Sequence, residues 1–160
     1  MTGVIAAVFL TACPTDDPVR VTVVVVLATD QNTTVDPKLV DLAKEVQKRD
    51  ETLTGFKIKA AEAKSIPIGD GYTFELLDKE VLRVRVERSR DADGRINLTI
   101  KPPGLEKITY HCTCGKYFPV VTPYQTKGGE VLIIAVMAKP CNVGKGEGKK
   151  AQAGWFPWRD

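Results

Sequence analysis

Residues with reactive side chains are scarce in this chain of 160 residues. It has one histidine, His111, and four cysteines. No serine lies in a G-x-S-x-G motif, no glycine-rich phosphate loop is present, and paired acidic residues occur only where turns are expected. The chain therefore lacks the motifs of serine hydrolases and nucleotide-dependent enzymes, and carboxylates in solvated turns are poor general acids. We expect a protein that is not an enzyme and holds no cofactor.

An excess of charge of one sign is also missing from most of the chain. From Lys139 onward there are five Lys or Arg residues and two acidic residues, and the preceding residues hold eighteen of each sign. The formal net charge of +3 therefore comes from the C-terminal end. Because nucleic-acid-binding domains usually carry a basic field, we expect no nucleic-acid partner.

No apolar run is long enough for a transmembrane helix, which needs about 20 residues. Residues 4–10 instead match the apolar core of a signal peptide, and Leu10 to Cys13 (LTAC) resembles the lipobox of bacterial lipoproteins, whose cysteine is acylated. We interpret residues 1–18 as a signal and lipobox-like segment with a short polar tether. Cys13 is then the lipidation site and membrane anchor, and the protein is exported, in the periplasm or at the outer membrane. Because no Lys or Arg precedes the run, the alternatives are a start codon further upstream or a frayed apolar N-terminus.

The first third of the remaining chain predicts a strand, a helix and a second strand. Residues 19–29 (VRVTVVVVLAT) are β-branched and nearly all apolar, as in a strand covered on both faces. Asp36 and Pro37 suit the N-cap and first position of a helix. The apolar residues that recur on one face of this helix are Leu39, Leu42, Ala43 and Val46. Gly55 marks the exit, and GFKIKA from residue 55 predicts a strand.

Alternation with a period of two predicts further strands. Apolar residues alternate around Ile66 and Ile68, again at 72–76, and then in two runs, 82–86 and 96–100, that flank the turn SRDADG. Further strands are expected from Ile108 and over the apolar run VLIIAVMA, which we place centrally in the sheet. The predicted fold is α+β, with one N-terminal helix packed on a largely antiparallel sheet or sandwich of about seven to eight strands. We expect one domain over residues 19–141.

Basic residues gather on the outward positions of the predicted hairpin. They are Arg83, Arg85, Arg88, Arg90, Arg95 and Lys101. Such a face suits phosphate or an anionic polymer, but acidic residues lie among the cations and no aromatic residues interleave for base stacking. We therefore favour a solvated sheet face over a binding surface.

The stretch YHCTCGKYFP at residues 110–119 holds the densest set of potential ligands. On a straight strand Cys112 and Cys114 point to one side and His111 to the other. In an oxidising compartment thiols form disulfides, so we expect Cys141 to pair with Cys112 or Cys114. The alternative is a small metal or thiol-redox protein in which Cys112, Cys114, Cys141 and His111 bind zinc or copper.

Residues 142–160 are rich in Gly and Lys and show no period, which predicts a flexible tail. Its end, WFPW, contains Trp155, Phe156 and Trp158. Exposed aromatic residues often anchor a partner, so we consider these three a candidate partner-binding site.

Five motifs stand out along the folded part of the chain: VVVVLAT, VDPKL, KSIPIGDGYTFEL, LTIKPPG and GGEVLIIAVMAKPC. Together they resemble small exported proteins of unknown function from planctomycete-like bacteria. This resemblance implies an exported α/β module and brings no activity. We expect a non-enzymatic, exported, lipid-anchored structural or interaction module of the cell envelope, with an envelope protein as its possible partner.

Overall fold

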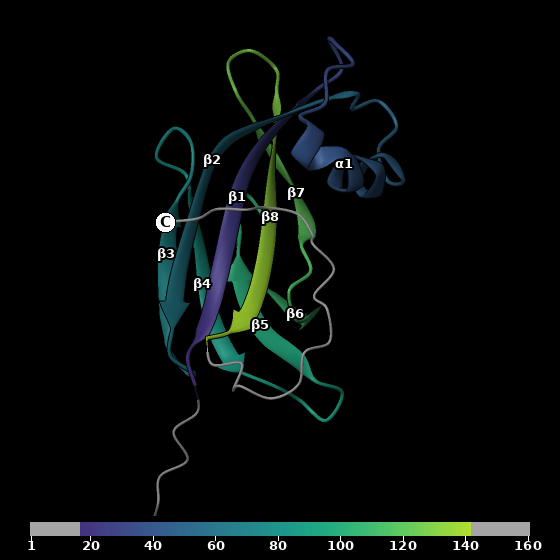
Figure 1. Cartoon of the computed structure of the whole chain (residues 1–160). Helices are drawn as coiled ribbons and strands as arrows, with labels where there is room; N and C mark the ends of the chain where they lie inside the picture. The colour runs from purple at the N-terminus through teal and green to yellow at the C-terminus, as the bar shows by residue number, and fades with distance from the viewer. Residues whose placement is uncertain (1–16, 142–160) are drawn as a thin grey trace, which may run out of the picture.

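The computed structural model describes residues 17–141, which form two four-stranded antiparallel sheets and one short helix (Figure 1). Cys13 and the aromatic residues at 155–158 lie outside the described residues. The strands are β1 (Val19–Thr29), β2 (Gly55–Ile66), β3 (Gly71–Glu75), β4 (Val81–Arg88), β5 (Arg95–Lys101), β6 (Ile108–Thr113), β7 (Phe118–Gln125) and β8 (Val131–Pro140), and a 3-10 turn (Pro37–Leu39) leads into the helix α1 (Val40–Gln47). The predicted α+β class, with one helix and seven to eight strands, is confirmed.

The first sheet, sheet A, has the strand order β2-β1-β8-β7. Its two central strands, β1 and β8, are the two longest apolar runs of the chain, and they pair from Val19 opposite Pro140 to Ala28 opposite Val131. Central strands are covered on both faces, so they need apolar side chains at consecutive positions. The predicted central place of the last strand is therefore confirmed.

The second sheet, sheet B, has the order β3-β4-β5-β6 and consists of consecutive antiparallel strands. Its alternation is the expected one. Leu82 and Val84 are buried, whereas Arg83 and Arg85 between and after them are exposed. The predicted hairpin is β4 with β5, and Gly94 closes its turn with φ 73° and a backbone hydrogen bond to the carbonyl of Asp91.

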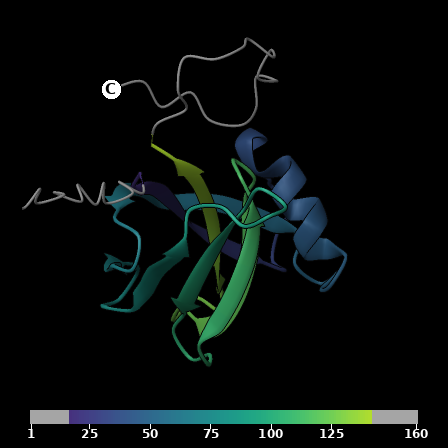
Figure 2. The same cartoon turned by 90° about the horizontal axis from the view of Figure 1, so that it is seen from below.

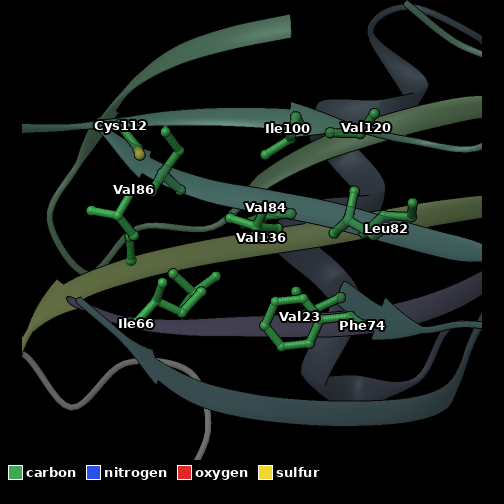
Figure 3. Close-up of a cluster of buried hydrophobic side chains, with 14 of the residues drawn as sticks. Val23, Ile66, Phe74, Leu82, Val84, Val86, Ile100, Cys112, Val120 and Val136 are labelled. Carbon is green, nitrogen blue, oxygen red and sulfur yellow. The ribbon is translucent and has the colours of Figure 1, made fainter. Parts of the chain in front are cut away.

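The main hydrophobic core lies between the two sheets (Figure 3). Alternate side chains of the central strands β1, β8, β4 and β5 point into this core. The close-up shows Val23 and Val136 of sheet A facing Phe74 and Val84 of sheet B. From sheet B the buried members are Phe74, Leu82, Val84, Val86, Ile96, Leu98, Ile100 and Cys112.

The helix covers the other face of sheet A. The Asp36 carboxylate accepts a hydrogen bond of 2.9 Å from the backbone N–H of Lys38, which is the predicted N-cap. The predicted apolar side, Leu39, Leu42, Ala43 and Val46, is buried in a second cluster with outward-facing residues of β1, β2 and β8. In Figure 2 the helix lies on one side of the molecule and β3 and β4 lie on the other. Within residues 17–141, therefore, no helix covers the outer face of sheet B.

Two strands differ from the sequence expectation. Residues 55–66 form one strand of 12 residues, and Ile68, which the alternation assigned to a strand, follows it in a turn. The sequence analysis assigned no strand to β7, whose apolar residues are interrupted by Pro119 and Pro123. A proline cannot donate to a sheet ladder and is tolerated where one side of the strand is unpaired. β7 lies at the edge of sheet A, which explains the difference.

Substitution of a central core residue tests the packing of the two sheets. Leu98 is fully buried between them, so Leu98→Ala leaves a cavity and should lower the free energy of unfolding by about 2–5 kcal/mol. Lys127→Ala, at an exposed turn position, is the control and should change it by less than about 0.5 kcal/mol. Denaturant unfolding of both variants measures the difference, and equal stability would contradict this description of the core.

Candidate functional site

Strand β6 separates the groups of the HCTC stretch as predicted. Cys112 is buried in the core between the sheets, and Cys114 packs partly buried against the same cluster. His111 is exposed on the outer face of sheet B. Since β6 is paired with β5 from Ile108 to Thr113, the regular pleat carries His111 away from both thiols.

The thiol of Cys112 is buried in the core and hydrogen-bonded there. Its Sγ donates a hydrogen bond to the carbonyl of Ile96, its cross-strand partner, at 3.1 Å. Burial raises the pKa of the Cys112 thiol to about 11, because the thiolate loses its hydration. The thiolate is the nucleophile and the metal ligand, so this environment disfavours both roles.

The other two cysteines have surroundings of their own. At the end of β6 the next residue after Cys114, Gly115, donates its N–H to the carbonyl of Ala138 in β8 at 2.9 Å. Cys141 is exposed, and its Sγ lies 3.3 Å from the hydroxyl of Ser65. All three described cysteines are free thiols. The structure therefore does not form the predicted disulfide of Cys141 with Cys112 or Cys114, which stays a prediction for the oxidised protein.

Metal ligands are likewise not brought together. Over residues 17–141, no three His, Cys, Asp or Glu side chains form a group suited to hold a metal ion. The alternative set of Cys112, Cys114, Cys141 and His111 is thus distributed over the core, the end of β6, the end of β8 and the outer face of sheet B.

His111 instead contributes to the turn between β4 and β5. Its Nδ1 lies 2.8 Å from Oδ1 of Asn97 and 3.9 Å from the carboxylate of Asp91. Asp91 accepts hydrogen bonds from the backbone N–H groups of Asp93 and Arg95 at 2.9 and 2.8 Å. The bond from Arg95 is the main reason why the pKa of Asp91 lies below its ordinary value. The DADG sequence is therefore a structured hairpin turn, as expected.

The outer face of sheet B brings distant cations into one row. Arg83 of β4 is the direct partner of Lys101 of β5, and Thr73 of β3 is the partner of Arg83 on the other side. The register of β5 with β6, continued by one residue beyond Ile100 and Ile108, places Lys107 next to Lys101. A row of three cations thus crosses the sheet. Sequence analysis identified Arg83 and Lys101 as basic residues of the hairpin. It did not identify Lys107, because only the pairing of β5 with β6 brings this residue next to Lys101.

An open hollow of about 290 Å³ lies along this row. Its lining residues are Gly71, Tyr72, Thr73, Arg83, Val84, Arg85, Thr99, Lys101 and Lys107. Four of them are cations and none is acidic. Arg85 lies 3.8 Å from the carboxylate of Glu87, whereas Arg83, Lys101 and Lys107 make no salt bridge or side-chain hydrogen bond with another residue in 17–141.

Two of the acidic residues that favoured a solvated face interact with groups other than Arg83, Lys101 and Lys107. Asp91 holds the β4–β5 turn, and Glu87 lies beside Arg85. The row from Arg83 to Lys107 is left without a counter-charge among the described residues. This row and its hollow, which we call the cationic hollow, form the candidate functional site.

Comparisons with protein-family models, with curated proteins and with solved structures find no match to this chain. The resemblance to small exported planctomycete-like proteins therefore stays a prediction. In the described part of the chain, the helical segment is too short to cross a bilayer.

Thiol labelling tests the surroundings of the cysteines. With a pKa of about 11, Cys112 is almost wholly protonated at pH 8, and burial also blocks access, so a thiol reagent should modify it only after unfolding. The exposed Cys141 should react within the mixing time of the native, reduced protein. Mass spectrometry of labelled peptides distinguishes the two, and rapid native labelling of Cys112 would contradict its placement.

The same experiment without reductant tests the disulfide. A bond from Cys141 to Cys112 or Cys114 makes Cys141 unreactive until reductant is added. Cys141 labelling that is equally fast with and without reductant would exclude the bond in the protein as purified.

Proposed function

We propose that this chain is a non-enzymatic binding module of the bacterial cell envelope, exported and tethered through Cys13, which uses the cationic hollow on sheet B as its binding surface. The observation that carries the proposal is the row of Arg83, Lys101 and Lys107, which share one open hollow and have no acidic partner in the described residues. Unneutralised cations around a concavity are suited to an anionic partner.

The two sides of the sandwich support this assignment. The outer face of sheet A is apolar where α1 packs on it, and that contact is satisfied within the molecule. The outer face of sheet B is polar and exposes its charged side chains. Sheet A has one comparable cation pair, exposed Arg20 opposite exposed Lys139, and the next residue across from Arg20 in β2 is Ser65. The row of three cations on sheet B is therefore the stronger candidate surface for a charged partner.

The chemistry of the cysteines supports a binding function over thiol chemistry. Cys112 is buried and its pKa is raised to about 11, the opposite of the lowered pKa of reactive thiols. The alternative of a metal or thiol-redox protein using Cys112, Cys114 and Cys141 has no comparable observation in its favour.

Neutralising the hollow tests its use as a binding surface. In a full-length chain with Cys13→Ser, which removes the lipid anchor, Arg83→Gln with Lys101→Gln should abolish sedimentation with washed bacterial envelopes at low salt, because two of the three cations of the row are removed. In the same background Lys44→Gln with Lys127→Gln removes the same charge from α1 and from the β7–β8 turn, and this control should sediment like the Cys13→Ser parent. If both double variants lose envelope sedimentation equally, the loss depends only on the net charge of the protein, and the proposal for this face is overturned.

Substitution of Cys13 tests the tether separately. We expect the full-length chain to incorporate labelled palmitate and to fractionate with membranes, and Cys13→Ser to lose both, because the lipid has no other attachment site in the lipobox-like segment. An unmodified chain that begins at Met1 and stays in the cytoplasm would refute export and lipidation, whatever the hollow binds.

A further inference from the structure

We infer that the cationic hollow binds an acidic polysaccharide, with a sugar carboxylate held between Arg83 and Lys101 and with Lys107 beside them. This inference rests on the proposed binding function and names the class of ligand. It follows from the register of the row, from the polar groups in the hollow and from what the surrounding surface lacks.

The cation row is an arrangement that the fold itself does not need. Arg83 and Lys101 are direct cross-strand partners, and like charges at such positions destabilise a sheet. Lys107 adds a third positive charge beside them. A ligand anion removes this repulsion, so the arrangement is stabilised when an anionic group is bound.

The spacing of the row suits one carboxylate or a short series of them. Neighbouring strands are about 4.8 Å apart, so the three cations converge on one region of the surface. Arginine can bind both oxygens of a carboxylate through its planar guanidinium group, whereas the lysines add charge from flexible side chains. A planar carboxylate between Arg83 and Lys101 is therefore bound by both, and Lys107, on the far side of Lys101, adds a third positive charge.

The remaining lining provides room and hydroxyl groups. Gly71 is the partner of Arg85 and contributes no side chain, which keeps that side of the hollow open. Thr73 is exposed at the end of the row. Thr99 lies in the neighbouring row, between Arg85 and Thr109, with its Oγ 3.4 Å from that of Thr109. Hydroxyl groups next to a carboxylate site match a sugar ring, which carries hydroxyls beside its acid group.

The surface lacks the features that other anionic partners use. Of the aromatic side chains of sheet B, Phe74 and Tyr110 pack on the core side. Tyr72 lines the hollow, but its ring packs edge-on with Phe74 at a centroid distance of 4.9 Å and Lys64 lies 5.1 Å from its centroid. Its ring is thus already in contact with other side chains, which makes it a poor stacking platform for the bases of single-stranded nucleic acid. The one large apolar side chain that is exposed within residues 17–141 is Val40, at the start of α1. Protein interfaces usually have an apolar centre and membrane-surface helices insert apolar groups, so an acidic polysaccharide is the best match.

Titration of the full-length chain with sodium polygalacturonate tests the inference. We expect saturable binding that weakens as salt is raised, and no binding of neutral dextran. Lys101→Gln with Lys107→Gln should weaken polygalacturonate binding at least tenfold, and Lys44→Gln with Lys127→Gln should leave it unchanged. The melting temperature of the Lys101 and Lys107 variant should stay the same or rise, because cross-strand repulsion is relieved; a lower melting temperature would show that the cations stabilise the fold instead.

A second variant tests the hollow without changing its charge. Gly71→Val places a side chain at its edge, where a Cβ would meet the carbonyl oxygen of Val84 at 3.2 Å. We expect weaker polygalacturonate binding in a variant that still melts cooperatively. Unchanged binding in this folded variant would show that the concavity plays no part and would reduce the site to surface charge.

Competing probes separate this inference from the proposed function. In the Cys13→Ser chain, which lacks the proposed lipid anchor, tighter binding to vesicles with anionic phospholipid, or to a single-stranded oligonucleotide, than to polygalacturonate would overturn the polysaccharide assignment. If envelope binding still depends on Arg83 and Lys101 in that case, the proposed function stands and only the ligand class falls. If neither envelopes nor any anionic probe binds, both fail.

Discussion

The packing of sheet A against sheet B is the interaction on which the rest of the structure depends. Strands β1 and β8 are apolar at consecutive positions, so each has two faces that must be removed from water. One face is buried against sheet B, in the cluster that includes Val23 and Val136. The other requires a second cover, which α1 provides through Leu42 and Val46. The order of the layers follows from these two requirements.

The same requirement does not apply to sheet B. Its strands alternate strictly, with Leu82, Val84 and Val86 facing the core and the residues between them facing outward. One cover is therefore sufficient, and the outer face is free to carry charge. Arg83 lies directly opposite Lys101 on this face, and the repulsion between the two like charges lowers the stability of the strand pair.

The stretch HCTC, which holds the densest set of potential ligands in the sequence, contributes Cys112 and Cys114 to this core. Cys112 occupies an inward position of β6, and its thiol donates a hydrogen bond to the carbonyl oxygen of Ile96 on the neighbouring strand. The side chain therefore acts as a small apolar core residue. His111, one residue away, is exposed and interacts with Asn97. The binding surface that we propose on sheet B consists of cations that the sequence analysis assigned to a solvated sheet face.

The amino-acid order by itself determined the local elements. The strand at Val19–Thr29, the cap at Asp36, the apolar face of α1 and the alternation through β4 and β5 could all be predicted, because each depends on residues within a few positions of one another. Only the tertiary structure decided that Pro119 and Pro123 lie in an edge strand, that Cys141 lies beside Ser65, and that Lys107 completes a row with Arg83 and Lys101. These facts depend on which strands pair and in which register. The pairing is determined by the burial of side chains far apart in the chain, and no local pattern contains it.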